Sequence, residues 1–278
     1  MAAVVGVALA VLVSAAMADW NPGDAYKWVQ PPDLSPAGMD VRVSQFNGIA
    51  DDFLCTQTGP ITDIHIWGSW LNDVLPQGET GGPNAGALSF DLAIFSDIPA
   101  SQSGTGYSMP DLQNQLWGTH FDPGQYTVRP VPPEGPEGWY GPTLEPPSIY
   151  LPGNHVGIYQ YNFFIDPEDA FFQQGTPEEP AVYWLGMLLP EGTPEGTEFG
   201  WKTSPVHWGD DAVVAFVLGF EDESVVFGLP LELRYPPGHP EMGQSVDMAF
   251  VITPEPATMA LMGIGLAVLV ARRRSRKS

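Results

Sequence analysis

Two pairs of adjacent aspartates are the residues whose type and spacing could do chemistry. Asp51-Asp52 and Asp210-Asp211 each lie beside an apolar segment of the chain. Carboxylate oxygens are the ligands that calcium prefers. Neighbouring side chains of an extended chain point to opposite faces, so a calcium site needs a carboxylate from each pair. The same aspartates can instead cap turns through backbone amides. We favour turn capping, with calcium at these four positions as an alternative and no other cofactor expected.

Motifs of the common catalytic mechanisms are absent from the sequence. It contains no G-x-S-x-G, no phosphate-binding loop, no H-E-x-x-H and no C-x-x-C. The histidines are scattered along the chain, at His65, His120, His155, His207 and His239. Two carboxylates across a cleft would suit glycoside hydrolysis, but 33 acidic residues make such pairs common by chance. We therefore predict that the protein is not an enzyme, and a secreted hydrolase is a weaker alternative.

Aromatic side chains in turn segments could bind sugar rings by stacking. Trp139 and Tyr140 lie in a stretch rich in glycine and proline, and Trp208 lies in another predicted turn. These three residues are the candidate glycan contacts, and extracellular polysaccharide is the corresponding partner. Large aromatic residues more often pack in cores. We expect core packing for three other tryptophans, which are Trp67, Trp70 and Trp184.

Charge is distributed unevenly along the chain. Ten lysines and arginines accompany 33 acidic residues, and the formal net charge is −23. Half of the basic residues lie in the arginine-rich C-terminal tail, so the rest of the chain is strongly acidic. Such a surface repels phosphate backbones, and nucleic acid is therefore not an expected partner. The single cysteine, Cys55, follows Phe53 and Leu54 and is predicted to be a buried free thiol.

The N-terminus has the pattern of an export signal. Residues 2–16 are apolar, and Ala16-Met17-Ala18 forms an A-x-A cleavage site for signal peptidase. Small residues are typical of this position because the peptidase admits little else. We predict a signal peptide over residues 1–18 and a mature chain that starts at Asp19.

The C-terminus consists of three parts in order. Pro254-Glu255-Pro256 precedes an uncharged apolar run over residues 257–271. The basic tail follows this run and begins with Arg272, Arg273 and Arg274. As a helix, the apolar run spans roughly 22 Å, which is less than the ~30 Å hydrocarbon core of a bilayer. We predict a short apolar helix that enters the inner membrane transiently, with the arginines on the cytoplasmic side.

This ordered tail over residues 254–278 resembles the PEP-CTERM sorting signal. The resemblance implies recognition by an exosortase in the inner membrane, cleavage near the Pro-Glu-Pro, and transfer to the cell surface or extracellular matrix. The same kind of tail is also catalogued as an ice-binding-protein C-terminal domain, a label that does not imply ice binding. An ordinary stop-transfer anchor is the less favoured interpretation.

The middle of the chain alternates between apolar and polar residues with a period of two. This alternation is clear in residues 63–67, 88–94, 159–163 and 246–252. Turns rich in proline, glycine and aspartate separate the segments. Short strands joined by such turns are typical of an all-β fold, either an antiparallel β-sandwich or a jelly roll. One short helix is predicted over residues 167–174, where proline and acidic residues suit a first turn.

Further motifs in this region resemble a domain found in exported PEP-CTERM proteins of environmental bacteria. The motifs are Tyr26-Lys27-Trp28, Ala50–Cys55, Ile61–Trp70, Phe199–Ser204 and His207–Ala212. The family has no assigned activity. The resemblance covers nearly all of residues 26–252 and implies one extracellular β domain with no assigned functional residues. With the two terminal segments set aside, we predict this domain over residues 19–253.

Together these features predict an exported, exosortase-sorted protein of the cell surface or extracellular matrix with a non-catalytic β-sandwich domain. A glycan-binding surface module is the alternative function. The expected partners are signal peptidase and exosortase during export, and the inner membrane through the C-terminal helix.

Overall fold

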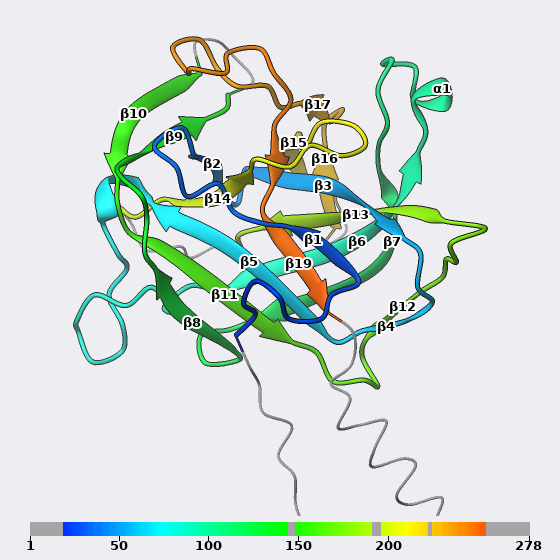
Figure 1. Ribbon diagram of the computed structural model, residues 1–278, viewed down its shortest axis with the longest axis horizontal. Helices are drawn as coiled ribbons and strands as arrows, with labels where there is room; N and C mark the ends of the chain where they lie inside the picture. The colour runs from blue at the N-terminus through cyan, green and yellow to red at the C-terminus, as the bar shows by residue number, and fades with distance from the viewer. Residues whose placement is uncertain (1–18, 144–147, 191–195, 222–223, 254–278) are drawn as a thin grey trace, which may run out of the picture. The chain divides into compact units, whose positions relative to one another are not determined.

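Strands dominate the described part of the chain, as the period-two alternation predicts (Figure 1). The computed structural model describes residues 19–143, 148–190, 196–221 and 224–253. The predicted signal peptide and the predicted C-terminal helix lie outside these ranges. Inside them, none of the helices has the length and apolar character that a membrane crossing requires.

The first sheet contains ten strands within the described ranges. Its main path runs through β1 (Trp28–Gln30), β19 (Phe250–Thr253), β5 (Asp63–Trp70), β14 (Phe199–Ser204), β2 (Met39–Val43), β9 (Glu137–Gly141) and β10 (Ile149–His155). Three strands attach beside this path, namely β11 (Ile158–Phe164) on β5, β8 (Tyr126–Val131) on β11, and β18 (Asp247–Met248) on β14. Among the described pairs, β2 and β9 run parallel and the others antiparallel.

The second sheet contains seven strands within the same ranges. Its path runs through β16 (Ser224–Phe227), β15 (Val213–Glu221), β3 (Asn47–Cys55), β13 (Ala181–Leu188), β6 (Phe90–Ile98) and β7 (Met109–Phe121), with β17 (Leu231–Glu232) on β15. Outside both sheets, β4 (Gly59–Ile61) pairs with β12 (Phe171–Gln173). The short helices are η1 (Leu71–Asp73) and α1 (Ala100–Ser103).

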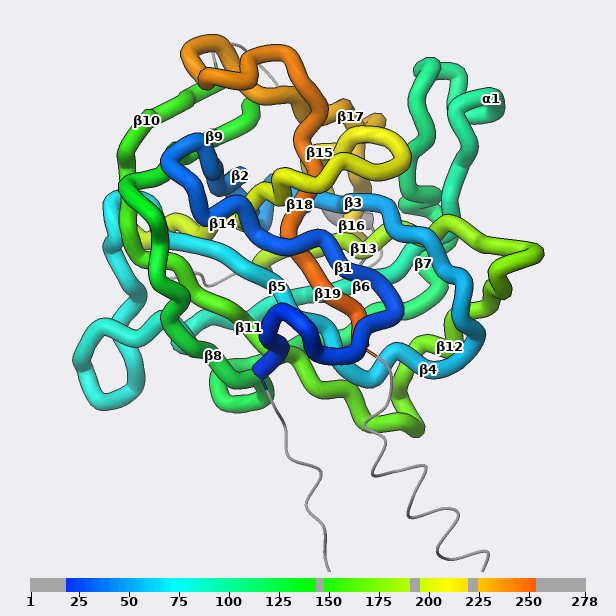
Figure 2. Tube along the Cα trace, viewed as in Figure 1, coloured from blue at the N-terminus to red at the C-terminus, as the bar shows by residue number. Residues whose placement is uncertain are grey.

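Strand β5 is the fork of the first sheet. Residues 63–66 pair with β19, whereas residues 68–70 pair with β14. The first and last strands, β1 and β19, therefore run side by side on one branch (Figures 1 and 2). The other branch continues through β14, β2, β9 and β10.

The two sheets pack face to face through the apolar faces that the alternation predicts. Phe90 of the second sheet meets Tyr161, Phe163 and Phe199 of the first sheet edge-on, with ring centroids 5.3 Å apart in each case. Edge-to-face contacts of this kind are favourable for aromatic pairs. The predicted core residues Trp67, Trp70, Trp184 and Cys55 are all buried. The prediction of an antiparallel sandwich is confirmed.

The helix predicted over residues 167–174 is wrong. Residues 171–173 form β12 instead, and Phe171 pairs with Ile61 of β4. So short a helix is marginal in water, because nucleation costs more than a few internal hydrogen bonds return. Strand pairing also places Phe171 against the main core, while Phe172 points outward and is exposed.

Candidate functional site

The sorting and processing residues of both termini lie outside the described residues. They are Ala16, Ala18, Pro254, Glu255, Pro256, Arg272, Arg273 and Arg274. The remaining predicted site residues can be located, and the structure adds two features to them: an open groove and a second buried cluster.

Acidic side chains gather around β3, and we name Asp51, Asp52, Asp97, Asp210 and Asp247 the aspartate cluster. Asp51 and Asp247 are fully buried, and Asp52 is 2% exposed. Because Asp51 and Asp52 are adjacent in a strand, their side chains lie on opposite faces of the sheet. Of the two predicted pairs, the structure brings Asp52 and Asp210 together: the Asp210 N–H donates to Asp52 Oδ2 at 3.2 Å.

Backbone amides are the main hydrogen-bond donors to this cluster. The Met248 N–H donates to Asp51 Oδ2 at 2.7 Å. The Trp208 N–H donates to Asp247 Oδ1 at 3.2 Å, and the His207 ring nitrogen Nδ1 lies 2.6 Å from Asp247 Oδ2. The aspartates thus hold the backbone of the turn around residues 207–210 and of the nearby strand end.

Burial raises the pKa of four acids in this cluster, namely Asp51, Asp52, Asp97 and Asp247. The pKa of Asp52 rises to about 8, first because the carboxyl is buried and also because Asp247, Asp210 and Asp97 place negative charge nearby. The Asp210 amide opposes that rise in part. Burial likewise raises the pKa of Asp51 well above its usual range, with Asp247 and Asp52 adding to it. A buried carboxyl without a counter-ion favours its neutral form, so this cluster retains protons at neutral pH.

At the predicted calcium positions, the described His, Cys, Asp and Glu side chains do not bring three donor atoms together. Calcium takes about six to eight oxygen ligands around one point. Among the described residues, the acidic and histidine side chains that gather three donor atoms within 4.8 Å are Asp40, Glu137 and His155, none of which was predicted. Asp211 has a different partner, because its carboxylate lies 2.7 Å from Arg234 Nη2.

The predicted glycan contacts lie in three different environments. Trp139 is 2% exposed and lies in β9, so its interpretation as a sugar-stacking loop residue is wrong. Its ring packs over Gly200, where a Cβ would lie 2.7 Å from the indole. Tyr140, the next residue of β9, is partly buried. Trp208 is also partly buried and meets Trp28 edge-on, with ring centroids 4.9 Å apart.

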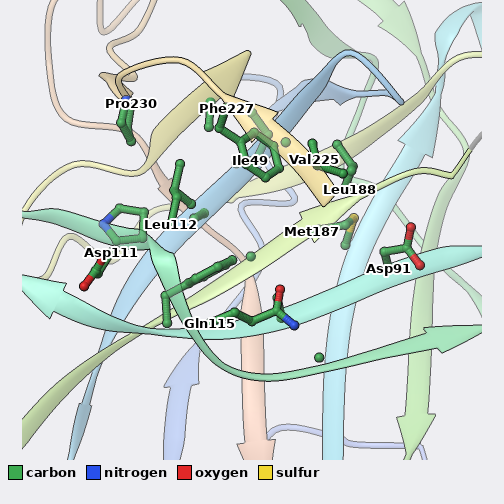
Figure 3. A pocket seen from close by; sticks show the side chains of 18 of the residues that line it. Ile49, Asp91, Asp111, Leu112, Gln115, Met187, Leu188, Val225, Phe227 and Pro230 are labelled. Atoms are coloured by element: carbon green, nitrogen blue, oxygen red, sulfur yellow. The ribbon is translucent and has the colours of Figure 1, made fainter. Parts of the chain in front are cut away.

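An open groove of about 1160 Å³ crosses the second sheet between β7 and β16 (Figure 3). Its lining combines polar and apolar side chains. Asp111, Leu112 and Gln115 come from β7, Asp91 comes from β6, and Phe227 comes from β16. Figure 3 shows Gln115 and Phe227 bordering this hollow from different strands. The groove therefore places hydrogen-bonding and apolar side chains on one open surface.

A second buried cluster, which the sequence motifs did not reveal, pairs opposite charges. We name Asp40, Glu137, His155 and Lys202 the ionic quartet, and all four side chains are 0% exposed. Lys202 of β14 lies opposite Asp40 of β2, and Glu137 of β9 lies opposite His155 of β10. The parallel pairing of β2 with β9 joins the two pairs. Four neighbouring strands thus bring one ionisable side chain each to a common point.

Within the ionic quartet, Lys202 stands between the two carboxylates. Its Nζ contacts the carboxylate of Glu137 directly and lies 3.4 Å from Asp40 Oδ2. His155 Nε2 lies 2.9 Å from the same Asp40 oxygen and 3.8 Å from Glu137 Oε2. Asp40 Oδ1, Glu137 Oε1 and His155 Nδ1 are buried and find no hydrogen-bond partner among the described residues. The quartet is therefore shielded from solvent, and the hydrogen-bonding capacity of its side chains is only partly used.

A loop and an indole ring close the quartet off from solvent. Gly38 lies against Lys202, since a Cβ at position 38 would approach Nζ at 2.7 Å and the Asp33 carbonyl oxygen at 2.4 Å. Trp139 meets the ring of His155 edge-on, with centroids 6.1 Å apart. The absence of a side chain at Gly38 allows the loop to lie directly over the lysine.

The pKa values of the two carboxyls in the quartet shift in opposite directions. Burial raises the pKa of Glu137 to about 7, against the opposing effect of Lys202. Burial alone would raise the pKa of Asp40 as well. The electrostatic effects of Lys202 and His155 outweigh burial and hold the pKa of Asp40 below its usual value. At neutral pH, Glu137 therefore carries its proton for a large part of the time, while Asp40 is ionised.

A metal ion does not fit this donor set. Asp40, Glu137 and His155 offer donor atoms within 4.8 Å of one another. The ammonium of Lys202, however, contacts both carboxylates and would repel a cation placed among them.

Comparison with known families agrees with both sequence resemblances. Residues 26–253 match the family described as Domain of unknown function (DUF7901), and residues 253–275 match the PEP-CTERM protein-sorting motif. No curated protein is similar enough to count as a match. The sorting motif marks an exosortase-sorted, exported protein directed to the cell surface. The chain therefore belongs to the DUF7901 family and carries a PEP-CTERM sorting motif at its C-terminus.

Proposed function

We propose that the protein is a non-catalytic structural component of the cell surface or extracellular matrix. The observation that carries this proposal is the burial of its most reactive groups. All four side chains of the ionic quartet are 0% exposed, and Asp51 and Asp247 of the aspartate cluster are fully buried as well. A substrate in solution cannot reach them, so these groups act on the protein's own backbone and on one another.

In this proposal, export proceeds in three steps. Signal peptidase removes the N-terminal segment, the apolar run holds the chain in the inner membrane for a time, and exosortase then releases the domain. The run over residues 257–271 is shorter than a bilayer core requires, which favours release over permanent anchoring. The acidic domain ahead of it remains soluble after release.

Cell fractionation of the full-length chain, followed with an antibody against the domain, tests this route. The wild-type protein is expected in the surface or matrix fraction. A variant with Pro254, Glu255 and Pro256 all changed to alanine is expected to stay in the membrane fraction. Ser275→Ala is the matched control and should behave like wild type. A wild-type protein that remains in the cytoplasm would overturn the proposal.

A glycan-binding module is the second candidate, and the groove between β7 and β16 favours it. Its carboxylate and carboxamide groups suit sugar hydroxyls, and its apolar side chains suit the C–H faces of the rings. A glycan array compares wild type with Gln115→Ala in the groove and Trp208→Ala outside it. Binding that is lost in Gln115→Ala alone supports the groove, and an array without binding by wild type removes this candidate.

A further inference from the structure

The ionic quartet contains every group that is needed to form an amide between two side chains. Such a reaction needs an amine against a carboxyl group, a base close to the amine, and the exclusion of water. Lys202 Nζ contacts the carboxyl of Glu137, and Asp40 Oδ2 lies 3.4 Å from the same nitrogen. Each of these side chains is 0% exposed.

We propose that Lys202 and Glu137 join in an intramolecular isopeptide bond once the domain has folded, with Asp40 as the proton acceptor. The bond links β14 to β9 across β2, which lies between them in the sheet. The chain has one cysteine, so an intrachain disulfide cannot supply a covalent link of this kind.

The reaction balances without an oxidant or a second reactant. The Lys202 ammonium gives one proton to the Asp40 carboxylate, and the free amine attacks the carboxyl carbon of protonated Glu137. A C–N bond forms, a second amine proton passes to the Glu137 hydroxyl, and the C–O bond breaks to release one water. The products are a neutral amide, one water and a protonated Asp40.

The protonation states of the two carboxyls match these roles. Burial, the largest influence, raises the pKa of Glu137 to about 7, so its protonated and electrophilic form is well populated at neutral pH. Burial alone would raise the pKa of Asp40 too, but Lys202 and His155 outweigh burial and lower the pKa of Asp40. Asp40 is therefore the carboxylate that can take a proton.

The geometry also selects Glu137 over Asp40 as the acceptor of the amine. Lys202 Nζ contacts the Glu137 carboxyl, whereas Asp40 Oδ2 is 3.4 Å away and is shared with His155 Nε2 at 2.9 Å. An ionised carboxylate is a poor electrophile, because its negative charge repels the attacking lone pair. Lys202 and His155 lower the pKa of Asp40 against the effect of burial, so Asp40 is suited to be the base.

The bond removes charges whose burial is otherwise unfavourable. Desolvation of a buried ion pair can exceed the attraction between its members, and a neutral amide avoids this cost. The bond also closes the chain between residues 137 and 202, which reduces the entropy of the unfolded state as a disulfide does. This inference is independent of the proposed function, since it concerns the chemistry of the folded domain alone.

Intact mass spectrometry of the denatured full chain tests the proposal. The wild-type mass should be lower, by one water, than the mass of the sequence between its observed termini. Lys202→Met should have the full sequence mass. Lys27→Met is the matched control and should retain the loss. A wild-type mass equal to that of the sequence overturns the proposal, whether or not any variant folds.

Trypsin gives a second readout on the same sample. Lys202 is the cleavable site between Arg42 and Arg234, because Arg129 precedes a proline. An unlinked chain separates there into two fragments. A linked Lys202 resists cleavage, so residues 43–234 should remain as one fragment that is lighter by one water. Complete cleavage at Lys202 in wild type would contradict the bond.

Sequencing of that fragment identifies the acceptor, and one further variant tests the base. A branched peptide that joins Lys202 to Glu137 supports the assignment, and a branch to Asp40 overturns it. Asp40→Asn keeps the amine and the acceptor and removes the base. It should slow the appearance of the lighter species after refolding by about 100-fold. An unchanged rate would exclude Asp40 as the proton acceptor.

Discussion

The ionic quartet and three members of the aspartate cluster, Asp51, Asp52 and Asp247, are buried, yet the two groups differ in how their charges are compensated. The quartet places an amine between two carboxylates, whereas the cluster gathers carboxyls around backbone amides. Burial alone would raise the pKa of both Asp40 and Asp52. The net pKa of Asp40 is nevertheless lowered, whereas the pKa of Asp52 rises to about 8. The comparison teaches that the neighbouring charge, and not burial alone, decides whether a buried acid is ionised here.

The two regions also differ in what they connect. In the quartet, side chains of four neighbouring strands contact one another, so the cluster ties β14 to β10 through β2 and β9. In the aspartate cluster, Asp52 and Asp247 accept bonds from the backbone amides of Asp210 and Trp208. The quartet therefore joins strands, while the aspartates support a turn.

Removal of the amine from the quartet has the largest expected effect. Lys202→Met removes the amine that contacts both buried carboxyls, and with it the proposed bond to Glu137, so the free energy of unfolding should fall by about 3–5 kcal/mol. Urea denaturation measures this loss. Lys27→Met, at the other lysine of the described chain, should change the free energy by about 1 kcal/mol or less. A loss of similar size in both variants would show that the quartet has no special role.

Removal of the ionisable group at Asp52 should raise the free energy of unfolding above neutral pH, in contrast to the loss expected for Lys202→Met. The pKa of Asp52 is about 8 in the folded chain against an ordinary value of 3.8. The folded state therefore holds this proton more tightly, and the resulting stability is complete below about pH 4 and is lost as the pH rises to about 8. Asp52→Asn keeps an acceptor for the Asp210 amide and cannot ionise.

This variant should be more stable than wild type at pH 8, by on the order of 2 kcal/mol. Its melting temperature should also vary less between pH 4 and pH 8. Thermal denaturation at a series of pH values checks both points. Parallel pH profiles for Asp52→Asn and wild type would contradict the raised pKa.

Each region contains a glycine whose replacement by alanine should affect stability in a way that distinguishes the quartet from the aspartate cluster. In Gly200→Ala, the Cβ would lie 2.7 Å from the Trp139 ring beside the quartet. In Gly209→Ala, it would lie 2.3 Å from Asp52 Oδ2, at a φ of +70°. Each change should cost about 1–2 kcal/mol through crowding or backbone strain. The pH dependence of stability should change in Gly209→Ala alone. A changed pH profile in Gly200→Ala would contradict this expected difference between the two regions.

The smallest effect is expected at the edge of the aspartate region. Arg234 is half exposed and pairs with Asp211 at 2.7 Å. Water screens such a pair, so Arg234→Gln should lower the free energy of unfolding by less than about 1 kcal/mol. Added salt should reduce the difference from wild type further. A larger loss of free energy that persists in high salt would show that this ion pair stabilises the fold as strongly as the buried quartet does, and would contradict the prediction.

Local patterns in the sequence predict much of the framework. Alternation in residues 88–94 identifies the strand that carries Phe90 into the core, and apolar surroundings identify Trp70 and Trp184 as buried. The same reasoning misplaced Trp139, because glycine and proline around it suggested a loop although the segment pairs with β2. A lysine in an apolar strand signals a buried counter-charge, but no local motif connects Lys202 with Asp40 or Glu137.

The sequence alone determined the C-terminal sorting motif, the strand segments and the side chains that face the core, because each depends on residues close together in the chain. Only the folded arrangement decided which strands become neighbours. It paired residues 171–173 with β4 in place of a helix, and it brought positions 40, 137, 155 and 202 to one point. Strand pairing is a long-range choice among many competing partners, and its energy lies in contacts that local periodicity does not specify.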